Sequence, residues 1–354
     1  MNNEWKDFLT EAGAEFAADN ADRVAHFGNP QRESQLVLNG SAIYDLSECA
    51  LIRASGEDVV DFLQGQLSND FAKVNSNSSQ LSAYCSPKGR VLALFRICQR
   101  DDIYYLRINS ELLDNTLNRL KMFVMRAKVE LELEDQLVLF GASGPEITQH
   151  LQHVFEELPA KENEAVQNGN VTIIKTNGIH PRFEILALLE EAKSIWHKLN
   201  VHAAPVGFNA SQLFKIQSAI PEFSPVTIDT QVPQMVNLEQ LDAINFDKGC
   251  YPGQEIVART HYLGKQKKRM YIVDWNGVER VEAGTALYQG KDKNGEPVGT
   301  ILYDAVHPDG RIVALAVMRI AAAEGSERIF VEHSSSTDVS IAAPPYGFML
   351  TTED

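Results

Sequence analysis

The hydrophobic positions of this chain recur with two different periods, and the changes of period mark its predicted elements. Near the start, apolar side chains follow each other at spacings of three and four residues. This spacing predicts an amphipathic helix inside a helical N-terminal extension over residues 1–34. The members of the stripe are Trp5, Phe8, Leu9, Ala12 and Phe16. The turn-rich sequence "FGNPQRES" at 27–34 predicts the link to the main body.

Two apolar runs then flank an Asn-Gly pair in "LVLNGSAIYDL" at 36–46, which predicts a β-hairpin. The next apolar run, "ALIRASG", predicts a strand that leads into a helix at "EDVVDFLQGQL". Strands at "RVLALFRIC" and "IYYLRIN" follow, with a helix after Ser110. Strands and helices alternate from about residue 35, and because the sheets are expected to be antiparallel with helices on one face, the fold class that we expect is α+β.

Residues 129–200 show the order β, β, α, β, β, α, which predicts a ferredoxin-like split βαβ domain with helices on one face of its sheet. We expect "LPAKENEAVQNGN" at 158–170 to be an exposed connector. After residue 268, short apolar runs are separated by Asn-Gly and Asp-Gly turns. This pattern predicts a C-terminal antiparallel β-barrel over 265–354.

Composition narrows the class of protein. The chain has 354 residues, of which 44% are hydrophobic and 23% charged, as in a globular protein. No apolar run is long enough to span a bilayer, and the N-terminus has no secretory signal, so we expect a cytoplasmic protein without membrane contact. The four cysteines form no C-x-x-C pair, and the spacing of ligand residues predicts no metal site.

The net charge of −16 argues against a broad nucleic-acid-binding face, because phosphate groups repel an acidic surface. One local exception is "GKQKKR" at 264–269. It is either a solvated loop or a small phosphate-contacting patch. The histidines form no H-x-x-x-H pair, and the chain lacks the glycine-rich loops of nucleotide-binding proteins and the G-x-S-x-G motif of hydrolases.

The strongest chemical candidate is "DKGCYPGQEIVARTHYLG" at 247–264. We expect a helix from Gln254 that ends before Gly264, with Cys250 just ahead of its N-terminus. The positive end of that helix and the neighbouring Lys248 ammonium should lower the thiol pKa of Cys250. A reactive or ligating thiolate is one interpretation, and a glycine-rich corner in which the cysteine merely fits is the other. Glu255 and Arg259 are spaced to pair along the helix.

The sequence "KGCYPGQEIVAR" resembles the signature of the YgfZ family of folate-binding proteins, which are relatives of the glycine cleavage T-proteins (aminomethyltransferases). "DFLQGQLSND" at 61–70 and "PQMVNLEQLDAINFDKGCY" at 233–251 extend the resemblance. It implies a three-domain ring around a central folate pocket. The folate-binding domain would combine residues 35–128 with 201–264 and stand beside the domains expected at 129–200 and 265–354.

The resemblance implies an accessory factor for iron–sulfur cluster assembly or repair that supports iron–sulfur enzymes such as tRNA methylthiolases. Its cofactor would be tetrahydrofolate or a derivative, with a possible transient iron–sulfur cluster. The partners would be iron–sulfur proteins or assembly factors, and the effect on tRNA would be indirect. The site residues that it implies are the reactive group Cys250, Lys248, Glu255 and Arg259, the folate ligands Gln217, Ser211, Asn69 and Gln254, and the motif residues Gly249, Tyr251 and Gly253.

Departures from the T-protein pattern separate three hypotheses. The acidic pair of T-proteins corresponds here to Ala93 and Leu94, which disfavours a classical aminomethyltransferase. Two tryptophans that are linked to folate in some YgfZ proteins correspond to Cys49 and Ser211, which removes aromatic stacking at those positions. The alternatives to the accessory factor are a folate-dependent one-carbon transferase and an adaptor that docks tRNA or a protein through 265–269.

Overall fold

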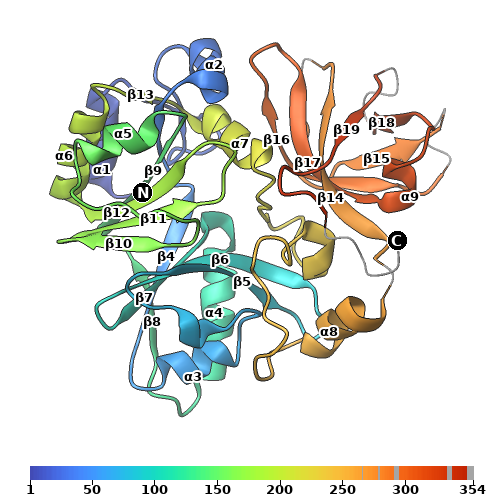
Figure 1. Cartoon of the computed structure of the whole chain (residues 1–354), viewed down its shortest axis with the longest axis horizontal. Coiled ribbons are helices and arrows are strands. Elements are labelled where there is room, and N and C mark those ends of the chain that lie inside the picture. Colours follow the sequence, from blue (N-terminus) through green and yellow to red (C-terminus); the bar gives the residue numbers. More distant parts are fainter. Residues whose placement is uncertain (265, 278–279, 291–294, 333–336, 349–354) are drawn as a thin grey trace. The chain divides into compact units, whose positions relative to one another are not determined.

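The computed structural model describes residues 1–264, 266–277, 280–290, 295–332 and 337–348 (Figure 1). The chain forms two compact units, each built from separate stretches of sequence. Unit 1 comprises Met1–Leu63, Phe71–Gln80 and Phe95–Phe214, and unit 2 comprises Gln64–Asp70, Leu81–Leu94 and Lys215–Asp354. Within the described residues, no helix has the length and apolar character needed to cross a membrane.

Unit 1 contains a six-stranded sheet in the order β10-β11-β12-β9-β3-β13. Its neighbouring strands run antiparallel, except that β13 is parallel to β3. The strands are β3 (Ala42–Asp45), β9 (Leu137–Ser143), β10 (Ala165–Asn168), β11 (Val171–Thr176), β12 (Arg182–Leu188) and β13 (Ala204–Pro205). Strand β10 lies inside the segment that we expected to be an exposed connector, so that prediction is wrong for residues 165–168.

Three helices cover one face of this sheet: α1 (Asn3–Glu11), α5 (Ile147–Gln152) and α6 (Leu189–Leu199) (Figure 1). The Trp5 ring lies in this core. It stacks on the Phe8 ring, with 5.1 Å between the ring centroids, and meets the Trp196 ring edge-on, with 5.5 Å between the centroids. The predicted amphipathic helix at the N-terminus is therefore confirmed over residues 3–11. Phe16 lies beyond it, in the short hairpin of β1 (Glu15–Phe16) and β2 (Val24–His26).

The predicted hairpin at 36–46 and the predicted turn at 27–34 are both wrong, because residues 30–39 form helix α2 (Pro30–Asn39). The Asn29 side chain accepts a hydrogen bond from the Arg32 amide, and Pro30 occupies the first turn, where its missing N–H costs nothing. The buried Glu33 carboxylate accepts from the amides of Phe27 and Asn29. These local bonds decide for the helix over the Asn-Gly hairpin signal.

The second sheet has five strands in the order β5-β6-β7-β4-β8. They are β4 (Cys49–Ser55), β5 (Ser79–Cys85), β6 (Val91–Arg100), β7 (Ile103–Asn109) and β8 (Glu130–Glu134), and β5 and β6 each run from one unit into the other. Strand β8 pairs with β4, so the first strand of the 129–200 segment belongs to a different sheet from β9 to β12. The proposed domain boundaries stay a prediction. The associated helices are α3 (Val59–Gln64), η1 (Phe71–Lys73), η2 (Ser110–Leu112) and α4 (Leu113–Val124).

Unit 2 contains a six-stranded antiparallel sheet in the order β18-β15-β16-β17-β14-β19. Its strands are β14 (Lys268–Trp275), β15 (Ala286–Gln289), β16 (Gly299–Val306), β17 (Ile312–Arg319), β18 (Ile329–Val331) and β19 (Ser340–Ala342). The predicted C-terminal antiparallel strands are therefore confirmed, and closure into a barrel stays a prediction. Helix α7 (Phe208–Gln217) leads from unit 1 into unit 2, which also holds η3 (Pro233–Val236), α8 (Gln254–Leu263) and α9 (Ile320–Ala323).

A buried carboxylate anchors α1 to the sheet of unit 1. The Trp5 indole Nε1 donates to Asp45 Oδ1 at 2.7 Å, and the Ser47 amide donates to Asp45 Oδ2 at 2.9 Å. Burial, with a further contribution from the Glu48 charge, raises the pKa of Asp45 to about 7. The folded state thus binds a proton on Asp45 at pH values where the unfolded chain does not.

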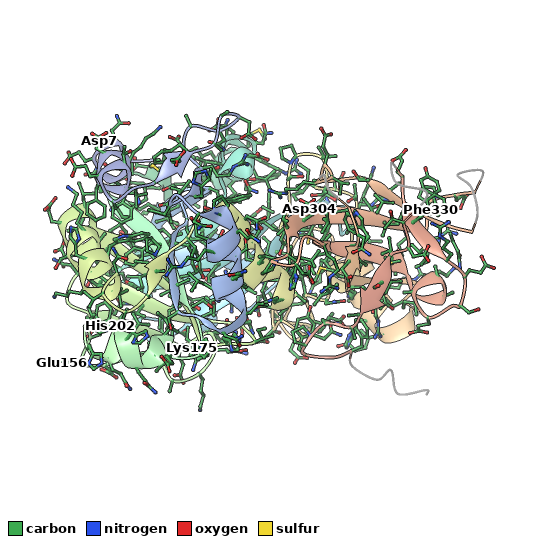
Figure 2. The ribbon with its side chains drawn as sticks, turned by 90° about the horizontal axis from the view of Figure 1, so that it is seen from above. Asp7, Glu156, Lys175, His202, Asp304 and Phe330 are labelled. Carbon is green, nitrogen blue, oxygen red and sulfur yellow. The ribbon has the colours of Figure 1, made fainter. Side chains whose placement is uncertain are left out.

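We predict that acidification from pH 8 to pH 5 stabilises the wild type relative to Asp45→Asn by about 2 kcal/mol. The sign follows because the folded-state pKa lies above the unfolded value, so the folded protein gains a proton as the pH falls through 7. Urea unfolding of both proteins at several pH values measures the difference. Asp7→Asn, on the exposed side of α1 (Figure 2), is the control. Parallel pH profiles for the wild type and Asp45→Asn would contradict the prediction.

Candidate functional site

The candidate site in unit 2 is organised around the start of α8. The helix spans Gln254–Leu263 and is followed by Gly264, as the sequence predicts. Gly253 precedes it with a φ of 79°, in the left-handed region that favours glycine. A Cβ atom at this position would lie 2.4 Å from the Ser86 carbonyl oxygen and 2.5 Å from Gly89 Cα. Gly253 is therefore needed both for its backbone conformation and for space.

The turn at 86–89 is the other half of this contact. Gly89 also has a positive φ of 66°, and a Cβ there would lie 2.8 Å from Ile256 Cβ. The sequence "CSPKGR" at 85–90 forms the turn that joins β5 to β6. Its role in seating the first turn of α8 was not foreseen. The one signal in the sequence was Gly89, because a residue with a Cβ atom would not fit so close to the start of α8.

Lys248 is held by the most specific set of contacts in the site. Its ammonium donates to three backbone carbonyl oxygens, those of Gln64 at 2.6 Å, Leu67 at 2.6 Å and Asn69 at 3.0 Å. The Nζ atom also lies 5.2 Å from the centre of the Tyr251 ring. Burial lowers the pKa of Lys248 to about 8, partly opposed by the Asp70 carboxylate. The side chain therefore fixes the 248–251 turn to residues 64–69.

Asn69, predicted to contact folate, joins three stretches of the chain. Its Nδ2 group donates to the carbonyl oxygens of Leu81 at 2.9 Å and Asp242 at 2.6 Å, and its Oδ1 accepts from the Asp70 amide. Both amide hydrogens are thus used within the protein. The neighbouring Ser68 hydroxyl adds a bond to the Ala243 carbonyl at 2.7 Å. Asn69 and Ser68 therefore hold in place the 64–69 segment, whose carbonyl groups bind Lys248.

Cys250 itself is exposed, in the coil between Lys248 and the start of α8. Because the three ammonium hydrogens of Lys248 are donated to carbonyl groups, none is left for the thiol, and the Lys248 charge acts on Cys250 only through space. A Cβ atom on Gly249, which precedes the cysteine, would meet no atom within 4 Å, so close packing does not explain this glycine. The thiolate character of Cys250 stays a prediction.

The remaining motif residues divide between buried and exposed positions. Tyr251 is buried, which raises the pKa of its phenol, and Gln254 Nε2 donates to the Lys248 carbonyl at 3.3 Å. Glu255 and Arg259 are both exposed, and in the part of the chain that the structure describes no ion pair joins them. The Glu255 carboxylate and the Arg259 guanidinium thus lie on the surface of α8, where solvent or a binding partner can reach them.

Two observations bear on the folate hypothesis. The Oε1 atom of Gln217, at the end of α7, is buried, and no donor reaches it among the residues described. A buried acceptor without a partner is costly, and an N–H donor of a bound ligand would satisfy it. At the positions of the T-protein acidic pair, Ala93 and Leu94 lie on β6, and Ala93 is fully buried. Gln217 Oε1 can thus accept from an N–H donor of a ligand, whereas no carboxylate is present at 93 or 94 to move a proton.

Ser211 belongs to unit 1 rather than to the unit that carries the other site residues. It is buried in α7, and its hydroxyl donates to the Phe208 carbonyl within the helix. Cys49, also in unit 1, accepts a hydrogen bond from Arg107 Nη1 at 3.2 Å.

The described residues contain no group of three or more His, Cys, Asp or Glu side chains placed to hold a metal ion. They therefore give no support to an iron–sulfur cluster ligated by this chain alone.

The comparisons with known proteins agree with one another. The model of the GCVT N-terminal domain matches residues 6–240. The tRNA-modifying protein YgfZ of Yersinia pestis (strain Pestoides F) is 31% identical over 279 residues, which cover 78% of this chain and 84% of that protein. The chain belongs to the YgfZ family. YgfZ of Colwellia psychrerythraea (strain 34H) is 29% identical over 289 residues, covering 81% of this chain and 88% of its own.

A solved relative shares the fold of the YgfZ family chain. The glycine cleavage system aminomethyltransferase T from Bartonella henselae superposes with a TM-score of 0.73 over 96% of both chains, at 17% sequence identity. The T-protein-like fold that the resemblance implies is therefore confirmed, as a mixed α/β fold. The ring of three domains and the folate pocket are not tested by this likeness, because at that identity only the fold is shared.

We predict that Lys248→Met destabilises the protein by about 2 to 3 kcal/mol, because three carbonyl groups lose a charged donor. Urea unfolding followed by fluorescence measures the loss. Lys267→Met, at an exposed position in the same region, is the matched control and should change the stability by less than about 0.5 kcal/mol. If the two variants unfold at the same urea concentration, Lys248 is not the link that its hydrogen bonds indicate.

Proposed function

We propose that this YgfZ family protein is a folate-binding accessory factor that supports iron–sulfur enzymes acting on tRNA, in the cytoplasm, through the thiol of Cys250. The observation that carries the proposal is the exposed Cys250, borne on a turn that Lys248 and Gly253 fix on either side. A turn built so tightly around an exposed thiol is hard to explain by packing alone. The names of the relatives, tRNA-modifying proteins, supply the process in which the thiol would act.

Cys250 is the best placed of the four cysteines for this role. Cys85 and Cys98 are buried, and burial raises the pKa of each thiol to about 12, so both stay protonated and unreactive at neutral pH. Cys49 is half-buried. An exposed thiol can attack an electrophile or act as one ligand of a cluster whose remaining ligands come from a partner protein. Iron–sulfur proteins or assembly factors are the partners we propose, with an indirect effect on tRNA.

Folate binding rests on Gln217. We propose that its buried Oε1 accepts a hydrogen bond from the pterin of a tetrahydrofolate derivative, which would offset the cost of leaving that atom unpaired. Transfer of a one-carbon group by the T-protein route is disfavoured, because Ala93 and Leu94 replace the acidic pair. Folate would then act as a bound regulator or as the carrier of an adduct that Cys250 processes.

The role of Cys250 is tested in cells that lack their own homologue of this protein. We predict that the wild type restores methylthiolated adenosine in tRNA, whereas Cys250→Ala at equal abundance leaves it at the level of cells carrying an empty vector. Mass spectrometry of digested tRNA measures the modification. Asp247→Ala, an exposed change in the same turn, is the matched control and should restore it.

Two outcomes of this experiment would count against the proposal in different ways. Restoration by both the wild type and Cys250→Ala would make the thiol structural and leave the family role standing. Failure of the wild type, at an abundance equal to that of the endogenous homologue, would remove the tRNA-modification role itself.

The folate site is tested separately with purified protein. We predict that 5-formyltetrahydrofolate at ten times its dissociation constant raises the Tm by about 2 °C. Gln217→Leu should weaken binding at least about tenfold, because it removes the acceptor. Gln217→Glu keeps acceptor oxygens and should retain binding. Equal affinity in the wild type and Gln217→Leu, measured by calorimetry, would place the folate elsewhere or exclude it.

A further inference from the structure

A layer of charged side chains lies inside unit 1, between its two sheets. On β12, Arg182 and Glu184 point away from the hydrophobic core that Phe183 and Ile185 join on the opposite face. Glu184 Oε2 lies 3.2 Å from Nε of Arg107, on β7 of the other sheet. Side chains from both sheets therefore meet in this layer.

The positive charges in this layer outnumber the negative ones. Arg96 on β6 is directly opposite Arg107 in the β6–β7 register. The layer thus holds the guanidinium groups of Arg96, Arg107 and Arg182 and, among the buried residues described, the single carboxylate of Glu184. Arg96 and Arg182 are each 3% exposed, and Glu184 is 2% exposed. These four side chains therefore carry a net positive charge.

Neutral groups are the hydrogen-bond partners of the two remaining cations. Arg96 Nη1 donates to Asn163 Oδ1 at 2.8 Å and to Ser79 Oγ at 3.2 Å. Arg182 Nε donates to the Tyr44 hydroxyl at 3.1 Å. Neither side chain forms an ion pair in the described parts of the chain, and Arg96 Nε is buried without a hydrogen-bond acceptor.

The charge on these groups persists at neutral pH. Burial lowers the pKa of Arg96, but only to about 10, and the Glu184 carboxylate opposes the shift. A buried guanidinium without a counter-charge is costly, and proteins normally place an anion beside it. Guanidinium groups bind oxyanions particularly well, because their N–H groups match two oxygen atoms at once. We propose that Arg96 and Arg182 bind a small oxyanion, a phosphate or a carboxylate, between the two sheets of unit 1.

Tyr44 supplies a third donor for this anion. Its ring lies over Gly141, where a Cβ atom would be 2.2 Å from Tyr44 Cε2, so only glycine admits the ring at this place. The hydroxyl accepts from Arg182, and its own hydrogen has no acceptor among the residues that the structure describes. The hydroxyl group can therefore donate to an oxyanion held by Arg182. Arg96, Arg182 and Tyr44 belong to unit 1, whereas Gln217 and Cys250 belong to unit 2.

The experiment uses the full-length protein, exchanged into chloride buffer and titrated with sodium phosphate or sodium glutarate at constant ionic strength. We expect one of these anions, at ten times its dissociation constant, to raise the Tm by about 2 °C above the chloride reference. Calorimetry should give one bound anion per chain. Arg96→Gln and Arg182→Gln should each weaken binding at least about tenfold. Arg53→Gln, which changes a partly exposed arginine of the same five-stranded sheet, should leave binding unchanged.

Each outcome decides something. A response to phosphate alone or to glutarate alone supports the site and identifies the chemistry of its ligand. No binding of either anion to the wild type with a dissociation constant below about 10 mM would overturn the proposal, and this result does not depend on whether the variants fold. Binding that survives in both Arg96→Gln and Arg182→Gln would also overturn it. Neither result would bear on the folate site or on Cys250.

Discussion

The candidate site of this protein depends on one partly buried cation, Lys248. The Lys248 ammonium makes three short hydrogen bonds to the carbonyl groups of Gln64, Leu67 and Asn69, which lie 179 to 184 positions earlier in the chain. Such bonds are stronger than those between neutral groups, and losing them would leave three carbonyl groups unsatisfied. Because the ammonium is committed to these carbonyls, Lys248 positions the turn that presents Cys250 instead of touching the thiol.

The glycine contact completes the same arrangement from the other side. Gly253 and Gly89 bring two backbone turns so close that a Cβ atom on either would overlap its neighbours. The first turn of α8 is thus seated on the turn that joins β5 to β6, while Lys248 holds the residues before it. Cys250 lies between these two fixed points and remains exposed. A rigid support around an accessible thiol suits a residue that reacts or ligates.

The distribution of charge follows a pattern that the net value of −16 conceals. Lys248 in unit 2 is partly buried, and Arg96 and Arg182 in unit 1 are buried. In unit 2 the cation is satisfied by carbonyl dipoles. In unit 1 two guanidinium groups have only neutral partners among the described residues, which is why an anionic ligand is the natural complement there.

The sequence by itself determined the features that depend on local chemistry. Helix α8 begins and ends where a glycine on each side predicts, and the strands β11 and β12 follow their apolar runs. Features set by distant contacts could not be predicted in this way. The Asn-Gly signal at 36–46 was overridden locally by the caps of α2, but the bond from the Gly207 amide to Glu33, which joins α2 to a distant part of the chain, had no local signal. The partners of Lys248, the pairing of β8 with β4 and the excess of buried guanidinium groups were likewise decided by the tertiary structure, because each joins residues whose sequence separation carries no periodic signal.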